Sequence, residues 1–151
     1  MQTTTTSEPH VFAEPTEPVS TKYMVVQVLA QLLFFVALLG PAVVGIGVKV
    51  QTIVPDAEKT TAIATVAGWG AAAALVANVL FGRFSDRTTS RWGRRRPWIV
   101  AGTIVMTFAF VIMALGQSIL VVTIGWFIAQ LGANAAFSPF IATVADQVPL
   151  V

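Results

Sequence analysis

Long stretches without any charged residue alternate with short charged segments along this chain. Residues 97–145 contain no Asp, Glu, Lys, Arg or His, and they exceed twice the roughly 20 residues that one membrane-spanning helix needs. The polar Gly-Gln-Ser triplet at 116–118 divides this stretch near its middle and predicts a tight turn there. Two shorter uncharged stretches precede it. The predicted spans are residues 23–48, 60–82, 97–115 and 119–145.

The segments between the predicted spans are short and polar. Residues 1–22 are rich in Thr, Pro and Glu and predict a disordered tail, because they lack the apolar residues of a packed core. Residues 49–59 form a loop, residues 83–96 form an arginine-rich loop, and residues 146–151 follow the last span. The chain is 56% hydrophobic and 11% charged, against about 25% charged residues in soluble domains. It is therefore predicted to be an all-α membrane protein with four transmembrane helices.

The arginine-rich loop determines the expected orientation. Residues 83–96 hold six arginines and one aspartate, a net charge of +5, whereas residues 49–59 and 116–118 add no net charge. Loops that carry excess Lys and Arg stay on the cytoplasmic side of a membrane. Both termini are therefore predicted to be cytoplasmic, and the two neutral segments external. Positive charge confined to one loop also argues against a nucleic-acid partner, which would need a basic face.

Uncharged amides are the informative polar side chains inside the predicted spans. Gln27 and Gln31 share one helix face, and so do Gln130 and Asn134, because residues four apart lie one above the other. Amides in hydrocarbon need hydrogen-bond partners, and each offers donors and acceptors that suit the hydroxyl groups of a sugar. All four are therefore candidate substrate-binding residues. Hydrogen bonds between helices, without any ligand, are an equally open interpretation.

Small residues and prolines predict where the spans pack and bend. The span at 60–82 is rich in Gly and Ala, which predicts at least one closely packed neighbour. Pro41 and Pro139 each remove a helix hydrogen bond, so both helices are expected to bend there. The four spans contain no Asp, Glu, Lys, Arg or His, so the sequence shows no proton- or ion-coupling group of its own. Neither a metal site nor a cofactor is expected.

The arginine-rich loop also resembles a known motif. The residues concerned are Gly82, Asp86, Arg87, Gly93, Arg94 and Arg95. Their order is similar to the cytoplasmic signature of major facilitator superfamily transporters, a Gly-x-x-x-Asp-Arg core followed by Gly and basic residues. The fuller string from residue 85 to 99 is similar to that of glycoside–cation symporters and plant-type sucrose transporters. Asn134, Pro139 and Asp146 resemble the end of that family's fourth helix.

This resemblance implies a secondary transporter, not an enzyme, in the plasma membrane. The family has twelve helices in two halves, and its substrate crosses at the midplane by alternating access, with a cation as the expected co-substrate. The four spans would then be an N-terminal fragment. Its expected partners are a sugar-like substrate, the lipid bilayer and the missing C-terminal helices. The resemblance implies a cytoplasmic gate made of Gly82, Asp86, Arg87, Gly93, Arg94, Arg95 and Asp146.

Two further classes of protein stay open at this point, and so does coupling. Sucrose-type relatives are expected to carry a carboxylate near the position of Gln130, and an amide cannot exchange a proton, which puts coupling through this span in doubt. A small four-helix exporter acting as a dimer is one alternative, but that class relies on a membrane-embedded glutamate that the spans lack. A non-transporting membrane scaffold is the other, and it leaves the loop around Asp86 and Arg87 unexplained.

Overall fold

The computed structural model describes residues 20–88 and 95–145, and every regular element in those ranges is helical. The elements are α1 (Thr21–Leu39), the π-helical turn η1 (Gly40–Gly45), α2 (Ile46–Ile53), the short turn η2 (Asp56–Glu58), α3 (Lys59–Arg87), α4 (Arg96–Leu115) and α5 (Ile119–Ala145). Because α1, η1 and α2 form one continuous segment, the described residues make four long apolar helices, as the sequence predicts. Helices suit a membrane because each one satisfies its own backbone hydrogen bonds.

The first helical segment continues further than the sequence predicts. It ends at Ile53 instead of near residue 48, so Lys49 is helical and does not belong to a loop. A residue that precedes proline is disfavoured in the helical region, and Val54, directly before Pro55, has extended backbone with φ −123° and ψ 151°. Pro55 therefore ends the first helical segment. The polar residues Lys49, Gln51 and Thr52 lie within the helix and do not end it.

Helix α3, which corresponds to the predicted span 60–82, likewise runs past its predicted end at Gly82. It reaches Arg87, and Thr88 then adopts extended backbone with φ −77° and ψ 125°. No further glycine or proline interrupts the helix before that point, so it continues into the arginine-rich segment. On the far side of that segment, α4 begins at Arg96. Pro97 occupies its first turn, where a missing N–H costs no helix hydrogen bond.

Pro41 changes the first helix without breaking it. Proline has no N–H and its ring crowds the preceding turn, so a regular α-helix cannot pass through it unchanged. Here the backbone widens into the π-helical turn η1, and the N–H of Ile46 donates to the carbonyl oxygen of Pro41. The expected bend is therefore a local widening inside a helical segment that runs from Thr21 to Ile53.

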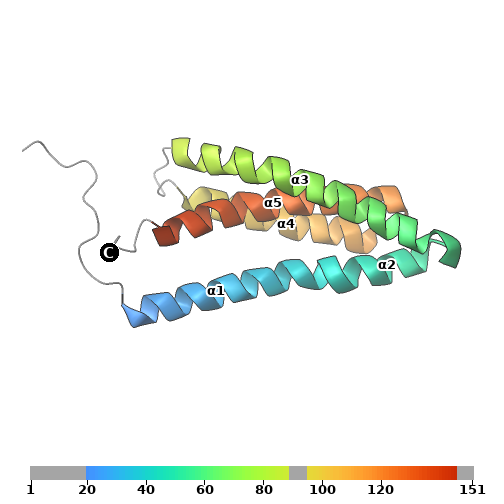
Figure 1. Cartoon of the computed structure of the whole chain (residues 1–151), viewed down its shortest axis with the longest axis horizontal. Coiled ribbons are helices and arrows are strands. Elements are labelled where there is room, and N and C mark those ends of the chain that lie inside the picture. The colour runs from blue at the N-terminus through green and yellow to red at the C-terminus, as the bar shows by residue number, and fades with distance from the viewer. Residues whose placement is uncertain (1–19, 89–94, 146–151) are drawn as a thin grey trace, which may run out of the picture.

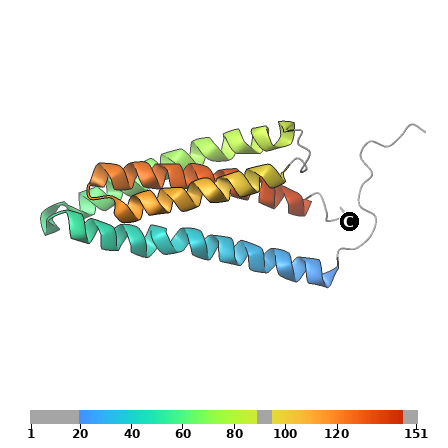
Figure 2. The same ribbon diagram turned by 180° about the vertical axis from the view of Figure 1, so that it is seen from behind.

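Helix α5 is the neighbour that α3 and α4 share. Both pack along it more extensively than they pack on each other, and Figures 1 and 2 show the three lying side by side. Helix α1 runs along this group and has no buried residue, whereas α2 joins the core. The buried core consists of Ile46, Val50, Ala62, Val66, Ala109, Met113, Val122, Trp126 and Ala129.

Small residues allow α3 to approach α5 closely. A methyl group on Gly70 of α3 would lie 2.0 Å from Nε1 of Trp126 of α5, which is itself buried. Ala73 and Ala77 of the same helix are fully buried. Short side chains permit such approach of two helix backbones. The close neighbour predicted for the Gly- and Ala-rich span is therefore confirmed, and it is α5.

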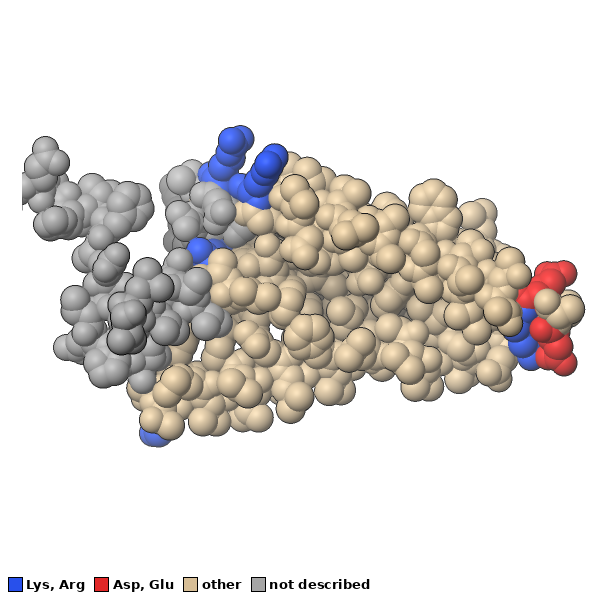
Figure 3. All heavy atoms as spheres, viewed as in Figure 1, with Lys and Arg blue, Asp and Glu red and all other residues tan. Residues whose placement is uncertain are grey.

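Charged residues in the described ranges lie near the ends of the long helices, and the face drawn in Figure 3 shows them gathered at the two ends of the bundle. One end, which we call the arginine end, is where α1 and α4 begin and α3 ends (Figure 1), so it carries Lys22, Arg83, Arg87, Arg95 and Arg96. At the opposite end, which we call the Asp56 end, α2 ends and α3 begins (Figure 1), so this end carries Lys49, Asp56, Glu58 and Lys59. The start of α1 and the end of α5 both lie at the arginine end (Figures 1 and 2). An uncharged middle suits helices that cross hydrocarbon, where a charge is costly.

Candidate functional site

Aromatic rings join α3 to α4 at the arginine end. The ring of Trp98 on α4 stacks on that of Phe84 on α3, with centroids 6.2 Å apart and an angle of 9° between the planes. It also lies 5.6 Å from the ring of Phe81. The indole N–H of Trp98 donates to the hydroxyl oxygen of Thr88 at 2.8 Å. These contacts bring together the two ends of the arginine-rich segment.

Two of the predicted gate residues contact α5. A methyl group on Gly82 would lie 3.4 Å from the hydroxyl oxygen of Ser138, so this glycine sits where α3 and α5 approach each other. Nη1 of Arg95 donates to the carbonyl oxygen of Pro139 at 3.5 Å. Arg95 is half-buried, whereas Arg87 is exposed. The arginine end therefore links the beginning of α4 to α5 through a guanidinium group.

The other predicted gate residues fall outside the described part of the chain. Gly93, Arg94 and Asp146 lie beyond the described ranges, and for Asp86 only the backbone, in α3, is described. The ion pairs expected of Asp86 and Asp146 with the arginines stay predictions.

The four predicted amides are half-buried in their helices. Nε2 of Gln27 is buried and has no hydrogen-bond partner within residues 20–88 and 95–145. Nδ2 of Asn134 donates to the backbone carbonyl oxygen of Gln130 at 2.8 Å, so one of its amide hydrogens is used within α5. Gln31, like the other three, is neither fully buried nor exposed. An unpaired amide hydrogen at Gln27 remains able to donate to a ligand or to another helix.

Phenylalanine rings separate the two amide pairs along the bundle. The ring of Phe137 on α5 stacks on that of Phe34 on α1, with centroids 5.3 Å apart, and meets Phe35 edge-on at 5.0 Å. Because α1 and α5 run in opposite directions (Figure 1), Gln31 lies on the arginine side of these rings and Asn134 on the other. Sequence spacing alone did not show this separation.

Comparison with known proteins identifies the family. A family profile described as "MFS/sugar transport protein" matches residues 59–145, which run from the first residue of α3 to the last of α5. The chain belongs to the MFS/sugar transport protein family. The match covers the three close-packed helices and the arginine-rich segment between α3 and α4.

Two curated relatives agree with this family. The sucrose transport protein SUT1 of Oryza sativa subsp. japonica and that of Oryza sativa subsp. indica are each 40% identical to this chain over 50 residues. That stretch is 33% of this chain and only 9% of the length of either relative. No solved structure matches the chain.

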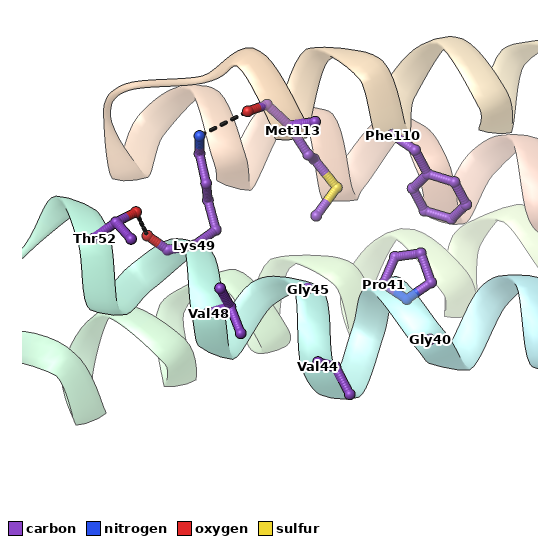
Figure 4. Close-up of a pocket in the computed structure, with 10 residues that line it drawn as sticks. Gly40, Pro41, Val44, Gly45, Val48, Lys49, Thr52, Phe110 and Met113 are labelled. Carbon is purple, nitrogen blue, oxygen red and sulfur yellow. Dashed lines mark hydrogen bonds between the residues drawn. The ribbon is translucent and has the colours of Figure 1, made fainter.

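This member of the family also contains a cavity of about 650 Å³ between the first helical segment and α4 (Figure 4). Its walls are apolar, apart from two polar side chains that are both engaged. Nζ of Lys49 donates to the carbonyl oxygen of Ala114 at 2.7 Å, and the hydroxyl of Thr52 donates to the carbonyl oxygen of Lys49 at 2.8 Å. None of the four predicted amides lines this cavity. An apolar wall does not recognise a sugar by its hydroxyl groups, so this cavity is not the candidate substrate site.

Sequence reasoning missed two of these contacts. It placed Lys49 in a loop, whereas the structure uses it to cap the end of α4, where carbonyl groups lack helical partners. It gave Trp98 only a place in a motif string and no contact with Thr88. Within the described ranges, no group of three His, Cys, Asp or Glu side chains is placed to hold a metal ion.

Proposed function

We propose that this chain is part of a secondary transporter that moves a sugar or a glycoside by alternating access, together with a cation. The observation that carries the proposal is the family match over α3, α4 and α5, reinforced by the 50-residue similarity to two sucrose transport proteins. An arginine-rich segment between two long apolar helices supports it, because that segment is where the resemblance implies the cytoplasmic gate.

The arginine end faces the cytoplasm in this proposal, and the membrane is the plasma membrane. Excess Arg and Lys side chains lie at that end, and the Asp56 end has no net charge among its described residues. Both chain ends of the described bundle, Thr21 and Ala145, lie on the arginine side (Figure 1). This arrangement supports cytoplasmic termini.

The amides on α1 and α5 form two levels of substrate contact in this proposal. Gln27 and Gln31 bind the substrate on the cytoplasmic side of the contact between Phe137 and the rings of α1. Gln130 and Asn134 bind it on the other side. The unpaired amide nitrogen of Gln27 supports a role as a donor to a sugar hydroxyl. Aromatic rings between two polar levels suit a path in which the apolar face of a sugar passes the rings while its hydroxyl groups exchange amides.

Further helices of the same transporter complete the cavity in this proposal. Helix α1 is almost entirely unburied, and many of its apolar residues are more than half exposed. Lipid covers part of such a surface, and further helices cover the rest. The cation-coupling group lies on those helices, because the described parts of the four spans contain no carboxylate or histidine in the middle of the bundle.

Uptake measurements test the proposal. Vesicles that contain the transporter carrying this chain should take up radiolabelled sucrose or an aryl glucoside in a saturable way. Gln130→Leu should raise the KM for uptake, since it removes a hydrogen-bonding amide at nearly constant volume. Gln117→Leu is the matched control, because Gln117 lies exposed in the turn between α4 and α5. An uptake rate that does not saturate with either sugar contradicts the proposal.

A further inference from the structure

Trp98 and Thr88 form a hydrogen-bonded relay that ends on α3. The indole N–H of Trp98 donates to the hydroxyl oxygen of Thr88 at 2.8 Å, and that hydroxyl donates to the carbonyl oxygen of Phe84 at 2.7 Å. The carbonyl of Phe84 lies in the last turn of α3. One threonine side chain therefore makes a hydrogen bond to the last turn of α3 and another to a donor on α4.

Ring packing adds to this relay. Trp98 stacks on Phe84 with its plane nearly parallel, and Phe81 contacts both rings, at 5.6 Å and 6.4 Å between centroids. Aromatic pairs at such distances attract each other beyond the area they bury. We call Phe81, Phe84, Thr88 and Trp98 the clasp. It consists of two residues from the last turns of α3, the residue directly after α3, and one from the first turn of α4.

The clasp joins two helices that otherwise meet mainly through a third. Both α3 and α4 pack along α5 more extensively than on each other. The clasp is a direct link between them, and two arginines of the predicted gate flank it. Arg87 directly precedes Thr88, and Arg95 lies three residues before Trp98. Arg95 in turn contacts the carbonyl oxygen of Pro139 on α5.

We propose that Trp98 and Thr88 are a positioning pair that holds the ends of α3 and α4 together, so that the arginines at this end move as one unit during transport. This inference rests on the proposed transport function. Neither residue contacts substrate in it, and both act through the arginines that they place. The pair should therefore affect the maximal rate of transport and leave substrate affinity nearly unchanged.

Four variants isolate the hydrogen bond. Trp98→Phe keeps an aromatic ring and removes the donor, Thr88→Val keeps the shape and removes the hydroxyl, and Thr88→Ser keeps the hydroxyl. Thr65→Val is the matched control, because Thr65 on α3 makes the same bond to the carbonyl four residues earlier but no bond to another helix. Besides this control, the fourth variant combines Trp98→Phe with Thr88→Val in one protein.

In the transporter that carries this chain, each single loss of the bond should lower the maximal rate of sucrose uptake about fivefold, the factor that one neutral hydrogen bond contributes. The KM should stay within about twofold. The double variant should match Thr88→Val, because the bond between the two side chains is already lost in that single variant. Thr88→Ser and Thr65→Val should transport like the unmodified protein. Additive losses, a raised KM, or a slow Thr88→Ser variant would overturn the proposal.

A distance measurement tests the clasp independently of transport. The chain has no cysteine, so spin labels can be placed on Arg83→Cys and Val100→Cys, both exposed positions on α3 and α4 near the clasp. The distribution of distances between the labels should broaden in Trp98→Phe and in Thr88→Val, and recover in Thr88→Ser. An unchanged distribution in the first two variants overturns the positioning role. If the unmodified protein takes up no sugar, the proposed function fails, and this measurement still decides the clasp.

Discussion

Gly102 of α4 and Gly132 of α5 face each other across the closest approach of these helices. A methyl group on Gly102 would lie 2.5 Å from the carbonyl oxygen of Gly132, and a methyl group on Gly132 would lie 2.8 Å from the carbonyl oxygen of Gly102. Side-chain carbons essentially never approach a backbone oxygen that closely. Neither helix can accept a larger residue here without moving away from the other.

Gly102→Ala should therefore destabilise the packing of α4 on α5. The obstacle is backbone, which cannot rotate aside, so we expect a loss of roughly 1–3 kcal/mol, the usual cost of overpacking. Thermal unfolding of the detergent-solubilised protein measures it as a lower Tm. Gly68→Ala is the matched control, because a methyl group there meets nothing within 4 Å and alanine favours the helix. A Tm for Gly102→Ala at or above that of Gly68→Ala would contradict the proposed contact.

Lys49→Met should weaken the attachment of α2 to the end of α4. The substitution keeps an unbranched side chain of similar length but removes the ammonium group that donates to the carbonyl oxygen of Ala114. A cation at a helix C-terminus contributes about 0.3–1 kcal/mol at partly exposed sites. A Tm decrease of a few degrees should follow in thermal unfolding, with Lys49→Arg close to the unmodified protein. Lys22→Met, at an exposed position outside the core, should leave the Tm unchanged.

Accessibility of single cysteines should show the arginine end inside the cell. The chain has no native cysteine, so Thr21→Cys and Ala57→Cys each report on one exposed position at opposite ends of the bundle. Excess basic residues keep their end in the cytoplasm. In intact cells, a membrane-impermeant maleimide should label Ala57→Cys and spare Thr21→Cys until the membrane is permeabilised. The reverse labelling pattern rules out the proposed orientation.

Asp86→Asn should slow transport more than it weakens substrate binding. The motif resemblance assigns Asp86 to a charged contact at the gate, and losing such a contact changes an equilibrium by about 1.5–3 kcal/mol, or roughly ten- to hundredfold. The maximal rate of sugar uptake should fall by at least tenfold at equal expression, with little change in the concentration needed for half-maximal uptake. Asp56→Asn is the control. Its carboxylate pairs with Lys59 at an exposed position of the opposite end, where an ion pair contributes little.

Local physics explains how far the sequence alone determined this protein. Backbone groups in hydrocarbon must be satisfied within their own helix, so an uncharged stretch of sufficient length is already a helix prediction. That argument is enough for the four apolar helices and for the collection of charge at two ends. The motif around Gly82 and Asp86 added the family. The predicted ends of the helices were less accurate, because they were placed at the first charged residue after each span. The first helical segment instead ends just before Pro55, and α3 ends just before the extended backbone of Thr88.

Tertiary structure alone decided which helix faces which. Trp69 and Trp126 have the same side chain and similar apolar neighbours in sequence, yet Trp69 is 57% exposed and Trp126 is 5% exposed, because only Trp126 faces the gap left by a glycine on another helix. The amides of Gln31 and Asn134 lie on opposite sides of the Phe137 rings because α1 and α5 are antiparallel neighbours. The bond from Trp98 to Thr88 depends on how two helices with a common neighbour meet at one end. Such relationships arise from packing between segments that are distant in the sequence. The hydrophobic periodicity, charge and hydropathy of a single segment do not predict them.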